Sequence, residues 1–221
     1  QGQSVTLVYV DDTEGWKNVQ DSTSNLTGNP FITATGGTIS TSGNCKIHKF
    51  TGPGTFTVTG AASCATNNIV SYLIIGGGGA SAGSGPGFNA VGGGGAGGYR
   101  EVKSPATPYT ASPLDGYPSS PNRVTVSAQA YPITVGAGAT AENNTAPRIP
   151  PQGSSSVALG ITSAGGGHGG QNCAPRVGGT GGSGGGTGGG NNCTSRASGN
   201  TPPTTPAQGN PGGNSPGGPP D

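Results

Sequence analysis

The stretch GGTGGSGGGTGGG at residues 178–190 decides how this chain folds. Its Gly-Gly-X triplets place Thr180 and Ser183 three residues apart, and the phase of the repeat changes before Thr187. A three-residue period matches the left-handed extended helix of polyproline II geometry, which has no internal hydrogen bonds. Because glycine has no Cβ, neighbouring helices of this kind approach closely enough to bond through their backbones. We therefore predict packed polyglycine II helices; a flexible linker is the alternative.

The same composition predicts helices of this type elsewhere. Glycine-rich runs lie within residues 76–98, 164–190 and 209–219, and we expect these segments to pack side by side. Ordering one residue costs ~1–2 kcal/mol of backbone entropy, whereas one net hydrogen bond returns about 0.5–1.5 kcal/mol. Isolated glycine helices therefore require neighbours, a β scaffold at their ends, or other subunits. Collagen is not expected, because the Gly-X-Y spacing is short and contains no Pro.

The composition excludes several classes of protein. The 221 residues include 48 Gly and 20 Pro, and only 8% are charged. A helical bundle is excluded because helix formers are scarce, and no apolar run approaches the roughly 18 residues that cross a membrane. The net charge of +1 leaves no electrostatic footprint for nucleic acid. Few groups are available for acid–base or nucleophilic chemistry, so we expect no enzyme, no cofactor and no metal site.

Short β-strands are predicted around the glycine-rich runs. Residues 45–50 and 55–60 resemble the two arms of a hairpin around a Gly-Pro-Gly turn. The apolar run at residues 69–75 is typical of a strand that is buried on both faces. We expect seven to nine strands in total and no helix longer than one turn. The predicted fold is all-β, an antiparallel sandwich or prism-like body carrying the glycine-rich segments.

Three stretches differ in composition. Residues 1–75 form an N-terminal β region, residues 76–163 a β scaffold with glycine-rich and Pro/Tyr-rich loops, and residues 164–221 a Gly/Pro-rich region. The sequence begins at Gln1 without a recognisable signal peptide. We expect a piece of a longer protein; a processed N-terminus is the alternative.

Four cysteines are present, Cys45, Cys64, Cys173 and Cys193. They show no zinc-binding spacing. Their order favours disulfides between Cys45 and Cys64 and between Cys173 and Cys193, and closing the second loop would contribute ~3 kcal/mol in the chain-entropy model. Free thiols are the alternative.

Candidate binding residues are few. Exposed Tyr and Arg side chains on loops are typical of adhesive surfaces. Tyr99, Arg100, Tyr109 and Tyr117 fit this description, although tyrosines that cap the end of a thin core are the alternative. His168 stands alone in GGGHGG, where it is either a ligand contact or a solvent-facing spacer.

Three motifs carry a resemblance: KIHKFTGPGTFTV, GGGGAGGYRE and YPITVGAG. With their surroundings they look like the glycine-rich domain of bacteriophage tail fibres, common among phages of marine bacteria. The resemblance implies a virion fibre protein, a homotrimer attached to other tail proteins, that reaches a bacterial surface glycan or outer-membrane protein. The tip adhesins of T-even-like phages are more loosely similar, and their glycine-rich motifs fold as packed polyglycine helices joined by recognition loops. No motif matches those adhesins residue by residue, so no binding residue is transferred.

The sequence departs from a whole fibre because it shows no tail-attachment region and no long shaft, which favours a distal fragment. The first hypothesis is therefore a non-enzymatic attachment domain located in the virion, without membrane insertion. A subunit of a glycine-rich extracellular or virion-surface filament is one alternative. An ice-binding protein is another, although the broken phase of Thr180, Ser183 and Thr187 does not give the regular flat face that ice binding requires.

Overall fold

A computed structural model describes residues 7–10, 12, 16–18, 29–83, 91–140, 149–171, 177–189 and 196–214. Within these ranges the fold is all-β, as the sequence predicts, with one 3-10 helix (η1, Ala65–Asn68) and no α-helix. The strands exceed the expected seven to nine, since several short pairs of three residues form. They are β1 (Leu7–Tyr9), β2 (Trp16–Asn18), β3 (Thr33–Thr35), β4 (Thr38–Ser42), β5 (Cys45–Lys49), β6 (Gly54–Gly60), β7 (Tyr72–Ile75), β8 (Tyr99–Val102), β9 (Ala130–Ile133), β10 (Ser156–Ala158) and β11 (Ile161–Ser163).

All named strand pairs are antiparallel. β6 is the central strand of a three-stranded sheet between β3 and β9, and the other strands form the pairs β1–β2, β4–β5, β7–β8 and β10–β11. Small sheets of this kind do not make a closed barrel. They instead supply fixed starting points for the segments that follow them.

The predicted hairpin between residues 45–50 and 55–60 is wrong. β5 pairs with β4 in a hairpin that turns at Gly43. Gly43 has a φ of 56°, in the left-handed region that glycine adopts readily because it has no Cβ. β6 pairs with β3 and β9 instead. Gly36, with a φ of 107°, turns the chain sharply between β3 and β4, which directs β4 onto β5. The pairing of β4 with β5 across the turn at Gly43 therefore replaces the predicted pairing across the Gly-Pro-Gly loop.

A small apolar core lies beneath β7, β8 and β11. Its buried members are Tyr72, Ile74, Val102 and Ile161. β7 is not buried on both faces as its apolar run predicts, because Leu73 and Ile75 are 57% and 56% exposed. The alternation arises because β7 and β8 form a two-stranded sheet whose inner face alone meets β11.

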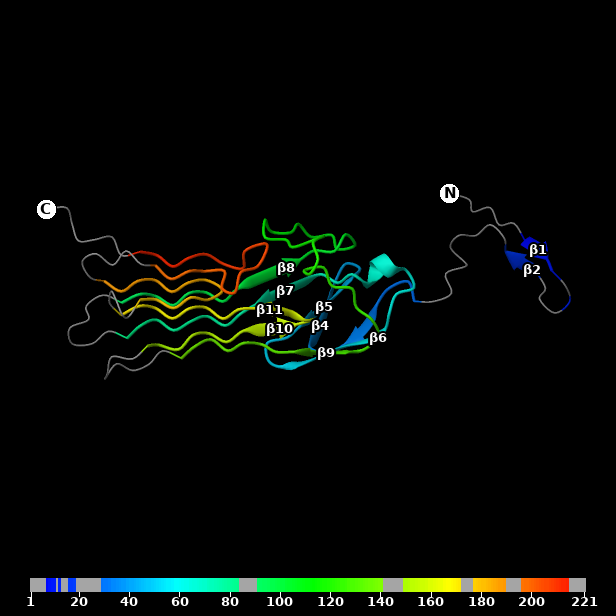
Figure 1. Ribbon diagram of the computed structural model, residues 1–221. Helices are drawn as coiled ribbons and strands as arrows, with labels where there is room; N and C mark the ends of the chain where they lie inside the picture. The colour runs from blue at the N-terminus through cyan, green and yellow to red at the C-terminus, as the bar shows by residue number, and fades with distance from the viewer. Residues whose placement is uncertain are drawn as a thin grey trace.

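Extended segments run out of these strands in one direction and form a bundle (Figure 1). Each of β7 and β11 leads directly into such a segment, β9 leads into one after two residues, and β8 and β10 each follow one. We call this array the glycine bundle, and the segments are residues 76–83, 91–98, 136–140, 149–155, 164–171, 177–182, 183–189, 196–200 and 209–214. The strands therefore fix the positions of extended helices that have no internal hydrogen bonds of their own.

The bundle is bonded with a period of three residues. Successive donors on residues 76–83 contact successive acceptors on residues 91–98, which run antiparallel to them. The N–H groups of Gly76, Gly79 and Ala82 donate to the carbonyl oxygens of Gly98, Gly95 and Gly92 at 3.0, 2.9 and 3.2 Å. This spacing is that of a helix with three residues per turn and no internal hydrogen bonds.

The next layer repeats the pattern. The N–H groups of Gly92, Gly95 and Gly98 donate to the carbonyl oxygens of Gly170, Gly167 and Ala164, each at 2.7 Å. The described glycines with positive φ are those of turns in the β part, Gly36, Gly37, Gly43 and Gly160. The bundle glycines therefore lie on the negative-φ side, in agreement with the polyproline II hand.

Residues 164–171 form the central helix of the bundle. Backbone hydrogen bonds join this helix to residues 76–83, 91–98, 149–155 and to both halves of residues 177–189. Every residue of it is buried or half-buried. Neighbours on several sides supply the hydrogen bonds that an isolated glycine helix lacks, as the sequence argument requires.

Residues 178–189 form two extended helices that run in opposite directions. The N–H groups of Gly179 and Gly182 donate to the carbonyls of His168 and Gly165, which makes the first half antiparallel to the central helix. The second half is parallel to it, because the N–H of Gly167 donates to Ser183 and that of Gly170 to Gly186. The chain thus reverses between these halves.

Three helices of the bundle were not predicted: residues 136–140, 149–155 and 196–200. They contain fewer glycines, since a helix on the outside needs a bare backbone only where it faces a neighbour. In residues 149–155, Pro150 and Pro151 fit because the extended helix has the φ that proline imposes.

Candidate functional site

The helix ends of the bundle gather at the end opposite the strands, which we call the distal end (Figure 1). Hydrogen bonds tie these ends together: Ala82 to Gly92, Gly92 to Gly170, Gly170 to Gly186, and Thr187 to Gly213. Residues 84–90, 141–148, 172–176 and 190–195 join consecutive helices there and lie outside the described residues. The described ends of four consecutive pairs of helices therefore face the same end of the bundle.

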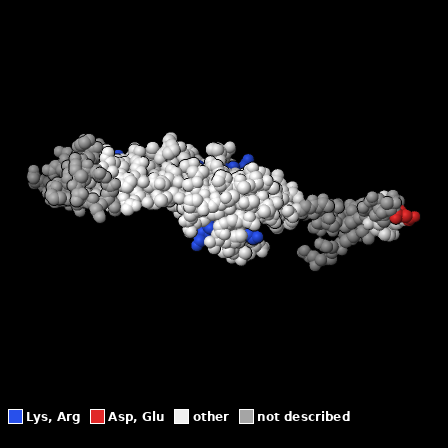
Figure 2. Space-filling view, turned by 90° about the horizontal axis from the view of Figure 1, so that it is seen from below, with Lys and Arg blue, Asp and Glu red and all other residues white. Residues whose placement is uncertain are grey.

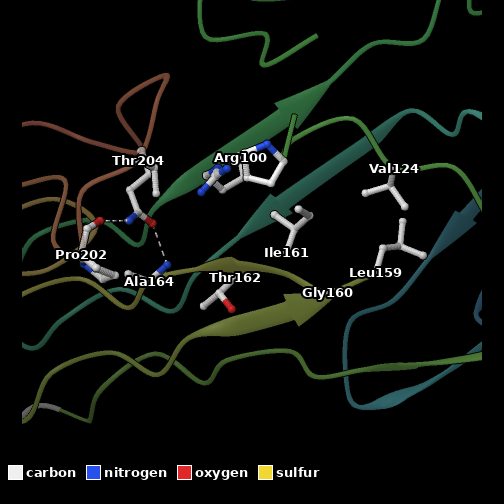
Figure 3. A pocket seen from close by; sticks show the side chains of 11 residues that line it. Arg100, Val124, Leu159, Gly160, Ile161, Thr162, Ala164, Pro202 and Thr204 are labelled. Carbon is white, nitrogen blue, oxygen red and sulfur yellow. Dashed lines mark hydrogen bonds between the residues drawn. The ribbon is translucent and has the colours of Figure 1, made fainter. Parts of the chain in front are cut away.

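A second candidate is an open groove of about 340 Å³ beside β8 and β11 (Figure 3). Its walls are the loop before β9, the β10–β11 turn and the C-terminal segment around Pro202. The lining residues are Arg100, Pro121, Val124, Leu159, Gly160, Ile161, Thr162, Ala164, Pro202, Thr204 and Gln208. We call this cavity the Arg100 groove.

Strand alternation directs Arg100 toward the groove. Along β8, Arg100 and Val102 share the inner face, while Tyr99 and Glu101 lie on the other. Arg100 is only 9% exposed, and its Nη2 donates to Asn122 Oδ1 at 2.5 Å. A cation is thus held in the wall of an apolar cavity by a neutral partner.

Asn122 is the residue that fixes this arrangement. It is 3% exposed, its Nδ2 donates to the carbonyl of Thr205 at 2.7 Å, and its own carbonyl accepts from Tyr72 Oη at 2.8 Å. The side chain of Asn122 thereby links Arg100 to the C-terminal segment, and its backbone carbonyl links the loop to the core. Arg100 is positioned by a rigid partner.

On the other face of β8, Glu101 is buried in a cluster of hydroxyl donors. Oε2 accepts from Tyr99 Oη at 2.9 Å, from the Ser112 backbone N–H at 3.1 Å, and from Ser112 Oγ. Burial raises the pKa of Glu101, but the hydrogen bonds from Ser112 and Tyr99 outweigh it and hold the pKa below its usual range. Burial, together with the charge of Glu101, raises the pKa of Tyr109 to about 12.

The structure separates the five residues singled out from the sequence. Tyr99 and Tyr109 meet at Glu101, and Arg100 lines the groove on the opposite face. Tyr117 is half-buried against the core, the position of a capping tyrosine. His168 lies half-buried in the central helix, with Nδ1 3.1 Å from the carbonyl oxygen of Gly169.

Sequence reasoning missed Gln208 and Asn200, which shape the C-terminal wall of the groove. Gln208 is 1% exposed, and its Oε1 accepts from Ala164 N–H at 2.8 Å while its Nε2 donates to the Pro202 carbonyl at 2.7 Å. Asn200, at a φ of 51°, accepts from Thr204 N–H at 2.9 Å. The Asn before Thr-Pro was a signal for a turn; no local signal marks Gln208.

A family profile described as a glycine-rich domain matches residues 50–220. The chain belongs to the glycine-rich domain family. The glycine-rich domain contains every helix of the bundle and all strands from β6 onward. Comparison with curated proteins and with solved structures gives no match.

Among its described residues, the glycine-rich domain has no group of three or more His, Cys, Asp or Glu that could hold a metal ion, and the same is true of the described residues before it. No helix in the described ranges is long and apolar enough to cross a membrane.

Two cysteines flank β6, Cys45 before the glycine-rich domain and Cys64 within it. Both are free, so the expected Cys45–Cys64 disulfide is wrong. It depended on a hairpin between residues 45–50 and 55–60, and β5 pairs with β4 instead. Cys173 and Cys193 lie outside the described residues, and their pairing stays a prediction.

Cys64 is expected to be the more reactive of these two thiols. It is exposed, and a hydrogen bond with Thr66 lowers its pKa, whereas Cys45 is half-buried. In a Cys173→Ser, Cys193→Ser background, a thiol reagent at neutral pH should modify Cys64 several-fold faster than Cys45, as peptide mass spectrometry would measure. Faster labelling of Cys45 would contradict the observed exposure.

The Glu101 cluster predicts an acid-dependent stability for the glycine-rich domain. Because the folded pKa lies below the ordinary value of 4.5, the carboxylate stabilises the fold above that pH, and this contribution is lost as the pH falls through the folded pKa. Glu101→Gln should cost about 1–3 kcal/mol at pH 7, and the difference from wild type should shrink at acid pH. Denaturant unfolding of wild type and variant at pH 7 and at acid pH measures this difference in stability. A difference that is the same at both pH values would show that the stabilisation does not come from the ionised carboxylate.

Proposed function

We propose that this chain is the distal, receptor-facing domain of a phage tail fibre, and that it attaches the virion to the bacterial surface. The observation that carries the proposal is the distal end, where the described ends of consecutive antiparallel helices of a backbone-bonded bundle gather. The resemblance of KIHKFTGPGTFTV, GGGGAGGYRE and YPITVGAG to fibre domains supports the same conclusion.

The bundle suits a receptor-binding role because its stability resides in backbone hydrogen bonds between the helices. Those bonds join the described helices backbone to backbone, so we expect them to tolerate changes in residues 84–90, 141–148, 172–176 and 190–195. Their sequences are therefore free to change with the receptor while the scaffold stays the same, as is usual for binding loops on rigid folds.

Low charge supports attachment in salt water. On the face shown in Figure 2, the described part of the bundle is almost free of charged side chains. At high ionic strength the Debye length is only ~3 Å, so exposed ion pairs contribute little. Recognition would use hydrogen bonds and apolar contacts, with affinity gained from several copies.

Trimerisation belongs to this proposal. Gly93, Gly94 and Ala96 on residues 91–98 are exposed, which leaves bare backbone at the edge of the bundle. A second copy can add its own glycine helix at such an edge. The proposal predicts a trimer in sedimentation analysis, and a clean monomer at micromolar concentration would contradict this part.

The test is adsorption of the fluorescently labelled protein to cultured marine bacteria. We expect binding to a subset of strains, and loss of that binding when residues 84–90 are replaced by a Gly-Ser segment of equal length. Lys46→Ala, an exposed change on β5, is the matched control and should bind as wild type. Adsorption to no strain, or equal adsorption of the loop variant, would overturn the proposal.

A further inference from the structure

We propose that the Arg100 groove binds an acidic sugar, with the carboxylate of the sugar on the Arg100 guanidinium. This inference rests on the proposed attachment function for its choice of a glycan, and it names a subsite far from the distal end. The groove itself is a property of the described residues (Figure 3).

Arg100 is a buried cation without an acidic partner. Within the described ranges no carboxylate forms an ion pair with it, and its recorded contact is the neutral Asn122. Glu101, the adjacent acid, lies on the opposite face of β8 and is occupied by Tyr99 and Ser112. Buried charges in proteins are normally paired, so the arrangement lacks an anion.

The guanidinium retains donors for that anion. Arginine has five N–H donors, and the hydrogen bond to Asn122 uses one nitrogen. Among the described residues, no nitrogen of Arg100 is both fully enclosed and without a hydrogen-bond partner; the atom in that condition is Gln171 Oε1. The remaining nitrogens of Arg100 are therefore not fully enclosed, and Arg100 lines the groove through which an anion can reach them.

The guanidinium is also held still, which favours paired recognition of a carboxylate. Asn122 is fixed by Thr205 and Tyr72, and Gln208 pins the Pro202 loop to Ala164 on the other side of the groove. A planar fork that is pre-positioned in this way matches the two oxygens of a carboxylate.

The rest of the groove indicates a sugar rather than a bare anion. Figure 3 shows Val124, Leu159 and Ile161 beyond Arg100, which gives the cavity an apolar end. The nearer end of the groove is polar, because Gln208 and Thr204 line it beside Arg100, with the Thr204 hydroxyl bonded to Asn200 Oδ1. A sugar ring presents C–H groups to an apolar wall and hydroxyls to its edges, and a cavity of 340 Å³ is in the size range of small-ligand sites. Inorganic phosphate would leave the apolar end unfilled.

The experiment is a titration of the full chain with methyl glucuronoside, followed by amide NMR shifts of Gly160, Thr162 and Gln208. We expect saturable shifts with a Kd on the order of millimolar, and at least ~tenfold weaker binding of the neutral methyl glucoside. No saturable shift, equal binding of the neutral sugar, or equal competition by inorganic phosphate would each overturn the proposal.

Variants separate a binding role of Arg100 from a structural one. Arg100→Lys keeps the charge but loses the planar fork, and should weaken glucuronoside binding by ~tenfold with an unchanged spectrum elsewhere. Val124→Ala removes part of the apolar end of the groove and leaves the Arg100 guanidinium in place, and should weaken binding several-fold. Arg123→Lys, at an exposed residue outside the lining, is the control and should bind as wild type. Unchanged binding by both groove variants would contradict the site.

This result is distinguishable from the test of attachment. Glucuronoside binding without cell adsorption would remove the fibre function and leave the site. Adsorption without glucuronoside binding would remove the site and leave the distal end as the attachment surface.

Discussion

Gly167→Ala is expected to lower the free energy of unfolding by about 3 kcal/mol or more, which is enough to disrupt the glycine bundle in a marginally stable chain. Gly167 lies buried in the central helix, and a Cβ at this position would overlap the carbonyl of Gly179 and approach the backbone nitrogen of Gly185 at 3.0 Å. These atoms belong to backbone, so no side chain can move aside. Thermal unfolding followed by circular dichroism measures the loss.

The matched control is Gly93→Ala, on residues 91–98 of the same bundle. Gly93 is exposed, its φ is not positive, and nothing lies within 4 Å of a Cβ built there. The same chemical change should alter stability by less than ~1 kcal/mol, because restricting the unfolded chain offsets any small cost. Equal destabilisation by the two variants would mean that glycine matters only for chain flexibility.

Gln208→Ala is expected to have the second-largest effect, a loss of about 2–4 kcal/mol. Gln208 is 1% exposed, and removing its amide leaves the buried N–H of Ala164 without its partner and releases the carbonyl of the exposed Pro202. The C-terminal segment would lose its attachment to the central helix. Denaturant unfolding measures the change, and NMR of residues 196–214 locates it.

Gln152→Ala is the control for that substitution. Gln152 Nε2 also donates to a backbone carbonyl, that of Thr180 at 3.0 Å, but the residue is exposed and water replaces the bond. Its loss should cost less than ~1 kcal/mol. A Gln208→Ala variant as stable as Gln152→Ala would show that Gln208 does not hold the bundle to the C-terminal segment.

The glycine helices were predictable where the glycines are dense, as at residues 76–79 and 164–170. Their bare backbone allows neighbouring helices to approach closely, and the period of three sets the side on which each residue bonds. The helix at residues 149–155 was not predictable in this way, because Pro150 and Pro151 are compatible with an extended helix but occur equally well in loops. The reversal between Gly179 and Ser183 also lacks a local signal, since it depends on the neighbours available to each half.

The candidate site shows the same division. Tyr99, Arg100 and Tyr109 are conspicuous in a chain with few aromatic and charged residues, and the structure gives each a defined partner. Their partners were not predictable from local sequence. Asn122 reaches Thr205 across 83 positions of chain and Gln208 reaches Ala164 across 44, and such contacts are set by the course of the bundle.

Amide hydrogen exchange of residues 91–98 tests the central claim most directly. The N–H groups of Gly92, Gly95 and Gly98 donate to the central helix, whereas those of Gly93 and Gly94 donate to no backbone carbonyl among the described residues. We expect slow exchange at every third residue, Gly92, Gly95 and Gly98, with fast exchange at Gly93 and Gly94. Exchange at random-coil rates throughout this segment would contradict a solid interior made of glycine backbone.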